Sequence, residues 1–322
     1  LAERGYIARV SFVGDVQKLK GDAVLAAKRW TGKVEQASPV SLANCDIVID
    51  ALFGAGLDRD VEGLPRAMIE AMNATATPVV AVDLPSGVNG TTGAVMGAAV
   101  NAARTVTFFR RKTGHALLPG RLHCGVLQVA DIGIPASVLD AIKPRAFVNR
   151  PALWGRSFPV PRADGHKYSR GHAVVVSGGL STTGAARLAA RGALRAGAGL
   201  ATIASPREAL AVNAAASLAV MVRPIDGPAE LTAFLADKRH NAVVLGPGGR
   251  VGQAMREQVA AALASEAAVV LDADALTSFA DRPEALSKAV ALRAGRGVVM
   301  TPHEGEFTRL FSKINSESKL NS

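Results

Sequence analysis

The sequence predicts an α/β protein built on parallel sheets in two successive domains. Short apolar runs end repeatedly in Asp, Gly or Ser, and Ala-rich stretches with helical spacing lie between them, which is the alternation typical of parallel sheets. The 322 residues are 49% hydrophobic and 4% aromatic and include 32 glycines. This length favours two domains, and the many glycines fit the frequent turns that such sheets need.

The first half alternates strands with helices from the start. We expect residues 1–15 to form the tail of a helix that stops at Gly5, followed by a strand. A short amphipathic helix then fits residues 21–30. The remaining expected elements are strands over 46–52, 79–84, 105–109 and 125–130, with a helix over 64–73.

The second half repeats this alternation. A polar lead-in from His166 precedes a strand and the glycine turn that ends at Gly179, and a long Ala-rich helix then fits residues 183–196. Three more strands are expected to begin at 243, 269 and 298, with helices over 253–265 and 283–293. No Gly-x-Gly-x-x-Gly fingerprint is present at the glycine turn that ends at Gly179, which argues against a standard dinucleotide oxidoreductase.

Polar residues stand where two strands of the first half end. The run Pro78-Val-Val-Ala-Val-Asp-Leu-Pro-Ser-Gly87 places Asp83 and Ser86 after one strand, and Asp50 with the Gly54 and Gly56 loop follows another. Ligands bind at the carboxyl ends of strands in open α/β sheets, so these groups indicate one site. The alternative is that both aspartates cap helices or satisfy loop amides.

Three strand ends of the second half carry similar chemistry. Val243-Val-Leu-Gly-Pro-Gly-Gly249 ends in a glycine loop, Val269-Val-Leu-Asp-Ala-Asp-Ala-Leu276 in two carboxylates, and Val298-Val-Met-Thr-Pro-His-Glu-Gly-Glu-Phe307 in an imidazole and carboxylates. Each tip alone is compatible with helix capping. Three in succession predict a ligand site at one sheet edge, next to the helix that begins near 183, whose free amides favour an anion.

The first half resembles the epimerase domain of the bacterial NAD(P)H-hydrate repair enzymes. The resemblance rests on Asp50-Ala-Leu-Phe-Gly-Ala-Gly-Leu57 and, some thirty residues on, Val82-Asp-Leu-Pro-Ser-Gly87. It implies a Rossmann-like domain in which Asp50 and Ser86 bind K⁺. It also implies Asp83 as the acid/base residue, since reversing a stereocentre requires a group that accepts and returns a proton. The implied substrate-binding residues are Gly54, Ala55, Gly56, Leu57, Asp58, Arg59, Asp60 and Asp83.

The second half resembles the ADP- or ATP-dependent NAD(P)H-hydrate dehydratases, which have a ribokinase-like fold. His166-Lys, Leu194-Arg-Ala-Gly-Ala-Gly-Leu200 and the three strand ends carry this resemblance. It implies that Ala185, Gly248 and His303 contact the hydrated nucleotide. It places Asp272 and Asp274 where ADP or ATP and Mg²⁺ assemble. Tyr168 departs from the His-Lys-Gly start of that family, which leaves the role of Lys167 open.

Together the two resemblances predict a repair enzyme with an epimerase-like domain at 1–145, a linker at 146–160 and a dehydratase domain at 161–322. The first domain is expected to lack its N-terminal part and the second its C-terminal part. The implied function is epimerisation of hydrated NADH and NADPH and dehydration of the S form. The alternatives are a ribokinase-like small-molecule kinase and a nucleotide-binding remnant without activity.

Composition excludes some partners and favours others. The net charge of +10 is spread over both halves, and the one tight basic cluster, Arg110-Arg111-Lys112, lacks interleaved aromatic residues, so we expect no nucleic-acid partner. The apolar stretch 209–222 is too short to span a bilayer. With Cys45 and Cys124 alone no disulfide framework is expected, and a reducing cytoplasm fits. We expect a homo-oligomer that binds small molecules.

Overall fold

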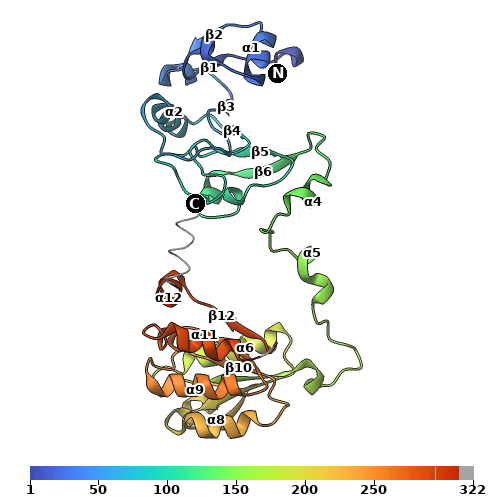
Figure 1. Cartoon of the computed structure of the whole chain (residues 1–322), viewed down its shortest axis with the longest axis vertical. Coiled ribbons are helices and arrows are strands. Elements are labelled where there is room, and N and C mark those ends of the chain that lie inside the picture. The colour runs from blue at the N-terminus through green and yellow to red at the C-terminus, as the bar shows by residue number, and fades with distance from the viewer. Residues whose placement is uncertain (294, 312–322) are drawn as a thin grey trace. The chain divides into compact units, whose positions relative to one another are not determined.

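The computed structural model describes residues 1–293 and 295–311. The chain divides into two compact units, Leu1–Arg156 and Ser157–Ser322 (Figure 1). Every strand pair within the three sheets of the described residues is parallel, which confirms the predicted α/β class. Within the described residues, no helix is both long and apolar enough to cross a membrane.

The first unit contains a two-stranded and a four-stranded sheet. In the smaller sheet β1 (Val10–Phe12) pairs with β2 (Val34–Gln36). The larger sheet has the order β3-β4-β5-β6, so each strand pairs with the next in sequence. Its strands are β3 (Val48–Asp50), β4 (Val79–Val82), β5 (Arg104–Phe108) and β6 (Val126–Ala130).

One face of the larger sheet carries the core of the first unit. The helix α2 (Gly63–Ala74) buries Met68, Ile69 and Met72 against the side chains of β3 and β4 that face it. On the opposite face Ile49 remains 48% exposed. The other helices of this unit are α1 (Asp22–Arg29), α3 (Gly120–His123), α4 (Val138–Ile142) and α5 (Pro151–Trp154), with 3-10 turns at Ala2–Arg4, Val16–Lys18, Pro39–Leu42, Thr113–His115 and Gly155–Ser157.

The second unit is built on a six-stranded sheet with the order β12-β11-β10-β7-β8-β9. Because β7 lies between β10 and β8, the strand order reverses direction beside it, and such a point is where α/β sheets bind ligands. The strands are β7 (His172–Val176), β8 (Leu200–Ser205), β9 (Met221–Pro224), β10 (Ala242–Leu245), β11 (Ala268–Leu271) and β12 (Val298–Met300).

Helices cover both faces of this sheet. Alternation along β7 sends Val175 to the face covered by α6 (Gly184–Ala196) and sends Val174 and Val176 to the opposite core. That opposite core is covered by α8 (Gly227–Leu235), α9 (Gln253–Ala264) and α11 (Pro283–Ala291) (Figure 1). The remaining elements are α7 (Leu210–Ala215), α10 (Asp274–Thr277), α12 (Glu304–Leu310) and 3-10 turns at Lys167–Arg170 and Arg207–Ala209.

The expected elements lie close to the observed ones, with two main differences. Residues 2–4 form a single 3-10 turn closed by Gly5 at φ 82°, not the tail of an α-helix. The strand expected over 46–52 is shorter, because the chain turns into the loop directly after Asp50. The apolar stretch 209–222 divides between α7 and the start of β9.

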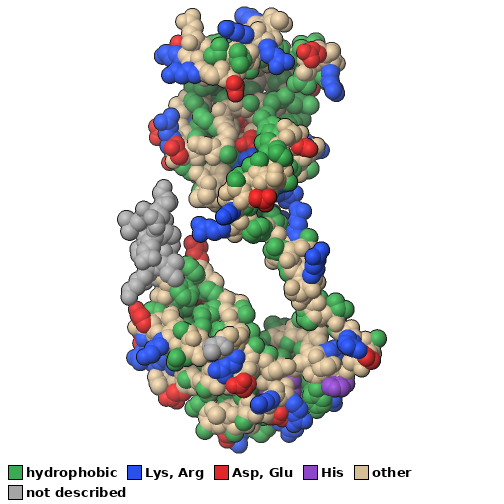
Figure 2. All heavy atoms as spheres, turned by 45° about the vertical axis from the view of Figure 1, so that its right-hand side comes forward, with side chains coloured by type: hydrophobic (Ala, Val, Ile, Leu, Met, Phe, Trp, Pro, Cys, Tyr) green, Lys and Arg blue, Asp and Glu red, His purple; other side chains and the backbone are tan. Residues whose placement is uncertain are grey.

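Charged side chains are distributed over both units. On the face that Figure 2 shows, Lys and Arg side chains lie among Asp, Glu and hydrophobic side chains. The basic cluster 110–112 is not a uniform surface feature: Arg110 and Arg111 are exposed, whereas Lys112 is partly buried. Lys112 therefore belongs to the interior of a site and not to a surface patch.

Candidate functional site

Asp50 and Ser86 meet in the interior of the first unit. Asp50 is the last residue of β3 and is only 1% exposed. The Ser86 hydroxyl donates to Asp50 Oδ1 at 2.5 Å, and the Ser86 backbone N donates to Oδ2 at 2.7 Å. The Phe53 N–H in turn donates to Ser86 Oγ at 2.9 Å, which ties the loop after β3 to the loop after β4.

Burial disfavours the ionised form of the Asp50 carboxyl. Burial raises the pKa of Asp50 above its ordinary value, and the hydrogen bonds from Ser86 and Leu52 offset only part of that rise. In the part of the chain that the structure describes, no Lys or Arg forms an ion pair with Asp50. A buried carboxylate without a cationic side chain is suited to a bound cation.

Asp83 stands one residue beyond β4, in a backbone conformation that few residues adopt. Its φ is 69°, and its N–H donates to Val106 O of β5 at 2.8 Å, so the sheet ladder fixes the position of a left-handed residue. Strain of this kind is often found at functional sites. A Cβ added at Gly54 would lie 3.7 Å from Asp83 Oδ2, which places the predicted glycine loop beside this carboxylate.

Three partners of Asp83 were not foreseen as site residues. Asp83 Oδ1 accepts from Thr107 Oγ1 at 2.8 Å and from Lys112 Nζ, with which it forms an ion pair, and the Asp83 carbonyl accepts from His115 Nε2 at 2.7 Å. Burial alone raises the pKa of Asp83. The bonds from Lys112 and Thr107 and the charge of Lys112 outweigh burial, and the net shift is downward. The one sequence signal was that all three residues lie on or just after the strand that pairs with β4.

The loop of residues 54–60 is attached to the rest of the site at several points. Asn89 Nδ2 donates to Leu57 O at 3.0 Å, and a Cβ on Gly90 would lie 3.0 Å from Ala55 O. The structure therefore brings the start of this loop to Asp83. It leaves Asp58, Arg59 and Asp60 exposed, and no hydrogen bond within the described residues joins these three to Asp83.

In the second unit, three loops approach each other backbone to backbone. A Cβ at Gly246 would lie 1.7 Å from Asp272 O, and one at Gly178 would lie 1.8 Å from Gly248 O, so only glycine fits at either position. Thr182 Oγ1 donates to Gly248 O at 2.8 Å. The turn before α6 and the loops after β10 and β11 therefore form one surface, with Ala185 in the first turn of α6.

The acidic pair lies on this surface, and His303 lies further along the sheet. Ala273, at φ 45°, separates the two carboxylates; Asp272 Oδ1 accepts from the Ala273 N–H at 2.9 Å, and Asp274 Oδ2 accepts from the Arg250 N–H at 3.0 Å. His303 caps α12 by accepting from the Gly305 N–H at 3.0 Å. It follows β12, two strands from β10, and no hydrogen bond among the described residues joins it to Gly248 or Ala185.

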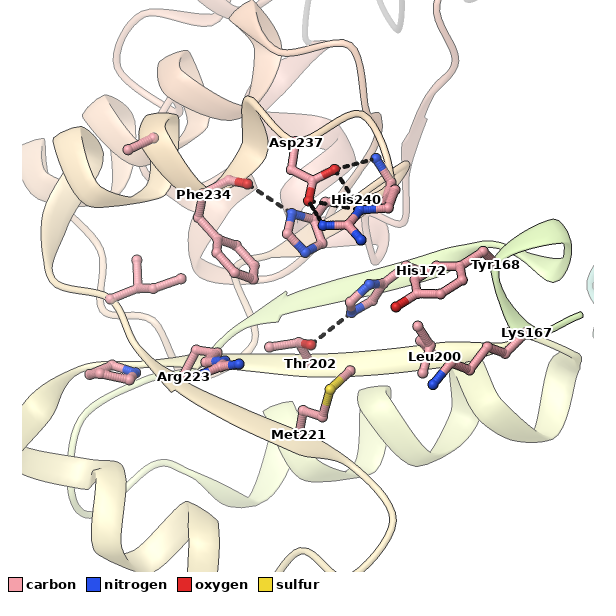
Figure 3. Close-up of a pocket in the computed structure, with 14 residues that line it drawn as sticks. Lys167, Tyr168, His172, Leu200, Thr202, Met221, Arg223, Phe234, Asp237 and His240 are labelled. Carbon is pink, nitrogen blue, oxygen red and sulfur yellow. Dashed lines mark hydrogen bonds and ion pairs between the residues drawn. The ribbon is translucent and has the colours of Figure 1, made fainter.

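A separate cavity of about 610 Å³ lies over the beginnings of β7 and β8 and along β9. Figure 3 shows the rings of His172 and His240 side by side in its lining, in an edge-to-face contact with their centroids 4.7 Å apart, and Lys167 and Tyr168 at its margin. The lining residues in the described part of the chain include none from the loops after β10, β11 and β12. The structure thus places Lys167 away from those predicted site loops.

No group of three or more His, Cys, Asp or Glu side chains suited to a metal ion occurs within residues 1–293 and 295–311. The candidate cation positions therefore offer one or two carboxylates each. At Asp50 the other available ligands are hydroxyl and carbonyl oxygens.

Comparisons with known proteins match a family model to each half of the chain. Residues 1–114 match the family model described as the YjeF-related protein N-terminus, and residues 173–322 match the one described as NAD(P)H-hydrate dehydratase. A solved ADP/ATP-dependent NAD(P)H-hydrate dehydratase from Bacillus subtilis, co-crystallised with ATP/Mg²⁺, is 28% identical, with a TM-score of 0.40 over 50% of this chain and 55% of that chain.

Several curated relatives carry the name bifunctional NAD(P)H-hydrate repair enzyme Nnr, and three of them illustrate the similarity. The protein from Moorella thermoacetica is 34% identical over 96% of this chain and 61% of its own. Those from Thermofilum pendens (34%) and Pyrobaculum aerophilum (38%) match 84% and 82% of this chain, and 52% and 51% of their own. The chain thus spans about half to three fifths of the length of these relatives. The predicted resemblance is confirmed: this chain is related to the bifunctional NAD(P)H-hydrate repair enzymes along most of its own length.

Proposed function

We propose that this chain repairs hydrated NADH and NADPH. The first unit interconverts the R and S hydrates, and the second unit dehydrates the S hydrate with ADP or ATP. The observation that carries this proposal is Asp83, whose carboxylate lies beside Gly54 of the glycine loop in a chain related to repair enzymes along most of its length. The substrate would contact residues 54–60 and Asp83 in the first unit, and Ala185, Gly248 and His303 in the second.

The chemistry of the first unit follows from the hydrate itself. Adding water to the nicotinamide double bond next to the ring nitrogen puts a hydroxyl on the carbon bonded to that nitrogen. Asp83 takes the hydroxyl proton, the O–H pair becomes the second C–O bond, and the C–N pair moves to nitrogen. Asp83 then returns the proton to nitrogen. These transfers open the ring and leave an aldehyde. When the ring nitrogen attacks the other face of that carbonyl, each transfer is reversed and the ring closes as the opposite epimer.

The donor set at Asp50 fits a potassium ion. Ser86 Oγ donates one hydrogen bond and accepts one from Phe53 N–H, so a lone pair remains, and Asp50 Oδ2 accepts only from Ser86 N among the described residues. Oxygen ligands of this kind suit a large, weakly polarising cation. We assign Asp50 and Ser86 to K⁺, which would neutralise the buried carboxylate and hold the two loops together.

In the second unit, Asp272 and Asp274 lie beside the Gly246–Gly248 loop, where the nucleotide and Mg²⁺ would assemble. Mg²⁺ binds proteins through one or two carboxylates together with phosphates and water, so this acidic pair fits it. Transfer of a phosphoryl group to the hydroxyl of the S hydrate, followed by loss of phosphate, restores the double bond. Backbone amides of the glycine turns would bind the phosphates.

The domain limits 1–145, 146–160 and 161–322 remain proposals, as do a homo-oligomeric assembly and a cytoplasmic location. The location rests on Cys45 and Cys124, both free thiols. Two alternative functions are tested by the same assay. A ribokinase-like kinase would leave a stable phosphate ester, and a nucleotide-binding protein without activity would bind ADP or the hydrate without turnover.

The test is the recovery of NADH, by absorbance and fluorescence, from a mixture of R and S hydrates with ADP, Mg²⁺ and K⁺. The Moorella thermoacetica relative serves as the positive control. Recovery of both epimers supports the proposal, and recovery limited to the S form assigns the dehydratase step alone. An accumulating phosphate ester, or no turnover where the relative recovers NADH, overturns it.

A further inference from the structure

Lys112 is the member of the basic cluster 110–112 that turns into the first unit. Its Nζ contacts Asp83 Oδ1, Thr107 Oγ1 at 2.9 Å and Phe108 O at 3.4 Å, and its side chain is 26% exposed. Arg110 instead stacks on the neighbouring Phe109 ring with its guanidinium carbon 4.3 Å from the centroid. Because an ammonium has three donors, these three acceptors account for the whole hydrogen-bonding capacity of Lys112.

The two carboxylate oxygens of Asp83 have different surroundings. Oδ1 accepts from both Lys112 and Thr107, whereas no hydrogen bond from the described residues reaches Oδ2. Oδ2 is the oxygen that lies beside Gly54. The Lys112 contacts therefore fix one oxygen and leave the other directed at the glycine loop.

His115 fixes Lys112 and Asp83 relative to each other. The Lys112 N–H donates to His115 Nδ1 at 2.9 Å, so Nδ1 carries no proton, and Nε2–H must be the donor to Asp83 O at 2.7 Å. The ring is 4% exposed, and burial together with the charge of Lys112 lowers its pKa, so it is neutral at pH 7. The neutral imidazole of His115 thus connects the backbone N–H of Lys112 to the backbone carbonyl of Asp83.

We propose that Lys112 is a positioning residue for Asp83, holding its carboxylate ionised with Oδ2 free for the substrate hydroxyl, and that His115 maintains this pair. The inference rests on the proposed epimerase function. Lys112 acts through Asp83 and not on the substrate, because its donors are already engaged. Among the described residues, the titratable groups that face Asp83 are Lys112, which is charged, and His115, which is neutral.

The first test is the pH profile of kcat/KM for conversion of pure S hydrate to the R form, measured by chromatography and corrected for spontaneous epimerisation. An opposite charge within about 4–6 Å lowers a carboxyl pKa by roughly 1–3 units. Lys112→Met is therefore expected to shift the acid limb of the kcat/KM profile to higher pH by about that amount and to lower the maximal kcat/KM. Lys112→Arg, which keeps the charge, is expected to keep the limb low.

The matched control is Arg111→Met. It removes one positive charge from the adjacent residue, whose side chain is exposed. It is expected to leave both the limb and the plateau unchanged. An unshifted limb in Lys112→Met, or an equal shift in Arg111→Met, overturns the inference. Absence of epimerisation in the unsubstituted chain would count against the proposed function alone.

The second test does not depend on activity. The Asp83 carboxyl is titrated by NMR in protein labelled with ¹³C at aspartate, with its signal assigned by its loss in Asp83→Asn. A pKa below the ordinary aspartate value that rises in Lys112→Met but not in Arg111→Met supports the inference. The same pKa in all three proteins overturns it, whatever the epimerase assay has shown.

Discussion

Ser86 supplies two of the donors that hold Asp50: its hydroxyl donates to Oδ1 at 2.5 Å and its backbone N to Oδ2 at 2.7 Å. Ser86, in the loop after β4, thereby donates a hydrogen bond to each carboxylate oxygen of Asp50, the last residue of β3. Since Ser86 Oγ also accepts from Phe53 N–H, the hydroxyl connects both loops of the candidate site. Stability and cation binding at this site should therefore depend on the same hydroxyl.

Ser86→Ala is expected to destabilise the first unit by about 1–3 kcal/mol, because it leaves a buried carboxylate and a backbone N–H each short of one partner. Both tryptophans, Trp30 and Trp154, lie in the first unit, so urea unfolding followed by tryptophan fluorescence reports on that unit. Ser137→Ala is the matched control, since Ser137 is exposed and makes no capping hydrogen bond, and it should change stability by less than about 0.5 kcal/mol. Equal midpoints for the two variants would contradict this role of Ser86.

Potassium is expected to stabilise the first unit more than lithium or choline at the same ionic strength. A ligand that binds only the folded state adds about 2.7 kcal/mol at 100 times its Kd. The tryptophan unfolding midpoint should rise with KCl in the unsubstituted chain and stay flat in Asp50→Asn and Ser86→Ala. A rise of the same size in either variant would place the cation elsewhere.

The strand ends were predictable from sequence, and their side-chain partners were not. Asp50 and Asp83 follow apolar runs, and parallel pairing of β3 with β4 brings such residues to one edge. The inward turn of Lys112 brings its ammonium to Asp83, 29 positions earlier in the sequence, and no local pattern encodes that contact. A cationic side chain in a loop looks solvated until the fold supplies its acceptors.

Two strands of the second unit also lacked a clear local signal. β8 is Leu-Ala-Thr-Ile-Ala-Ser and follows Ala-Gly-Ala-Gly, a composition with weak strand preference. β9 has four residues and ends in Pro224. Both segments become strands through their packing in the core, because β8 lies between β7 and β9 and buries Ala201 and Ile203 against α6. Packing thus overrides local propensity here.

His115 is expected to make the first unit sensitive to acid. Burial lowers its pKa in the folded state below the ordinary 6.5, so between that folded value and 6.5 the unfolded chain binds a proton that the folded chain does not. The stability from neutral His115 is therefore complete above pH 6.5 and is lost as the pH falls below it. Protonation at Nδ1 would also remove the acceptor for the Lys112 N–H.

The measurement is the free energy of unfolding of the first unit at intervals from pH 8 to pH 5, by urea and tryptophan fluorescence, for the unsubstituted chain and His115→Gln. One proton accounts for a slope of at most about 1.4 kcal/mol per pH unit. The variant should be less stable at pH 8 and show a shallower slope below pH 6.5. Identical slopes would mean that His115 does not sense the pH of this site.

Two glycine-to-alanine substitutions in the second unit should change stability in opposite directions. Gly246 has φ 119°, and an added Cβ would lie 1.7 Å from Asp272 O, a backbone atom that cannot move without shifting the loop after β11. Gly192 lies on the exposed side of α6 with no atom within 4 Å of an added Cβ. Gly246→Ala is expected to cost more than about 3 kcal/mol, and Gly192→Ala to add roughly 0.5–1 kcal/mol.

Hydrogen exchange with mass spectrometry reads both effects locally. Peptides from β10 and β11 should exchange faster in Gly246→Ala, and those from α6 should exchange more slowly in Gly192→Ala, each relative to the unsubstituted chain. Because the chemical change is the same, opposite signs can only arise from the backbone surroundings. If Gly246→Ala retained the protection of β10 and β11, the loops after these strands would not approach each other as closely as the structure shows.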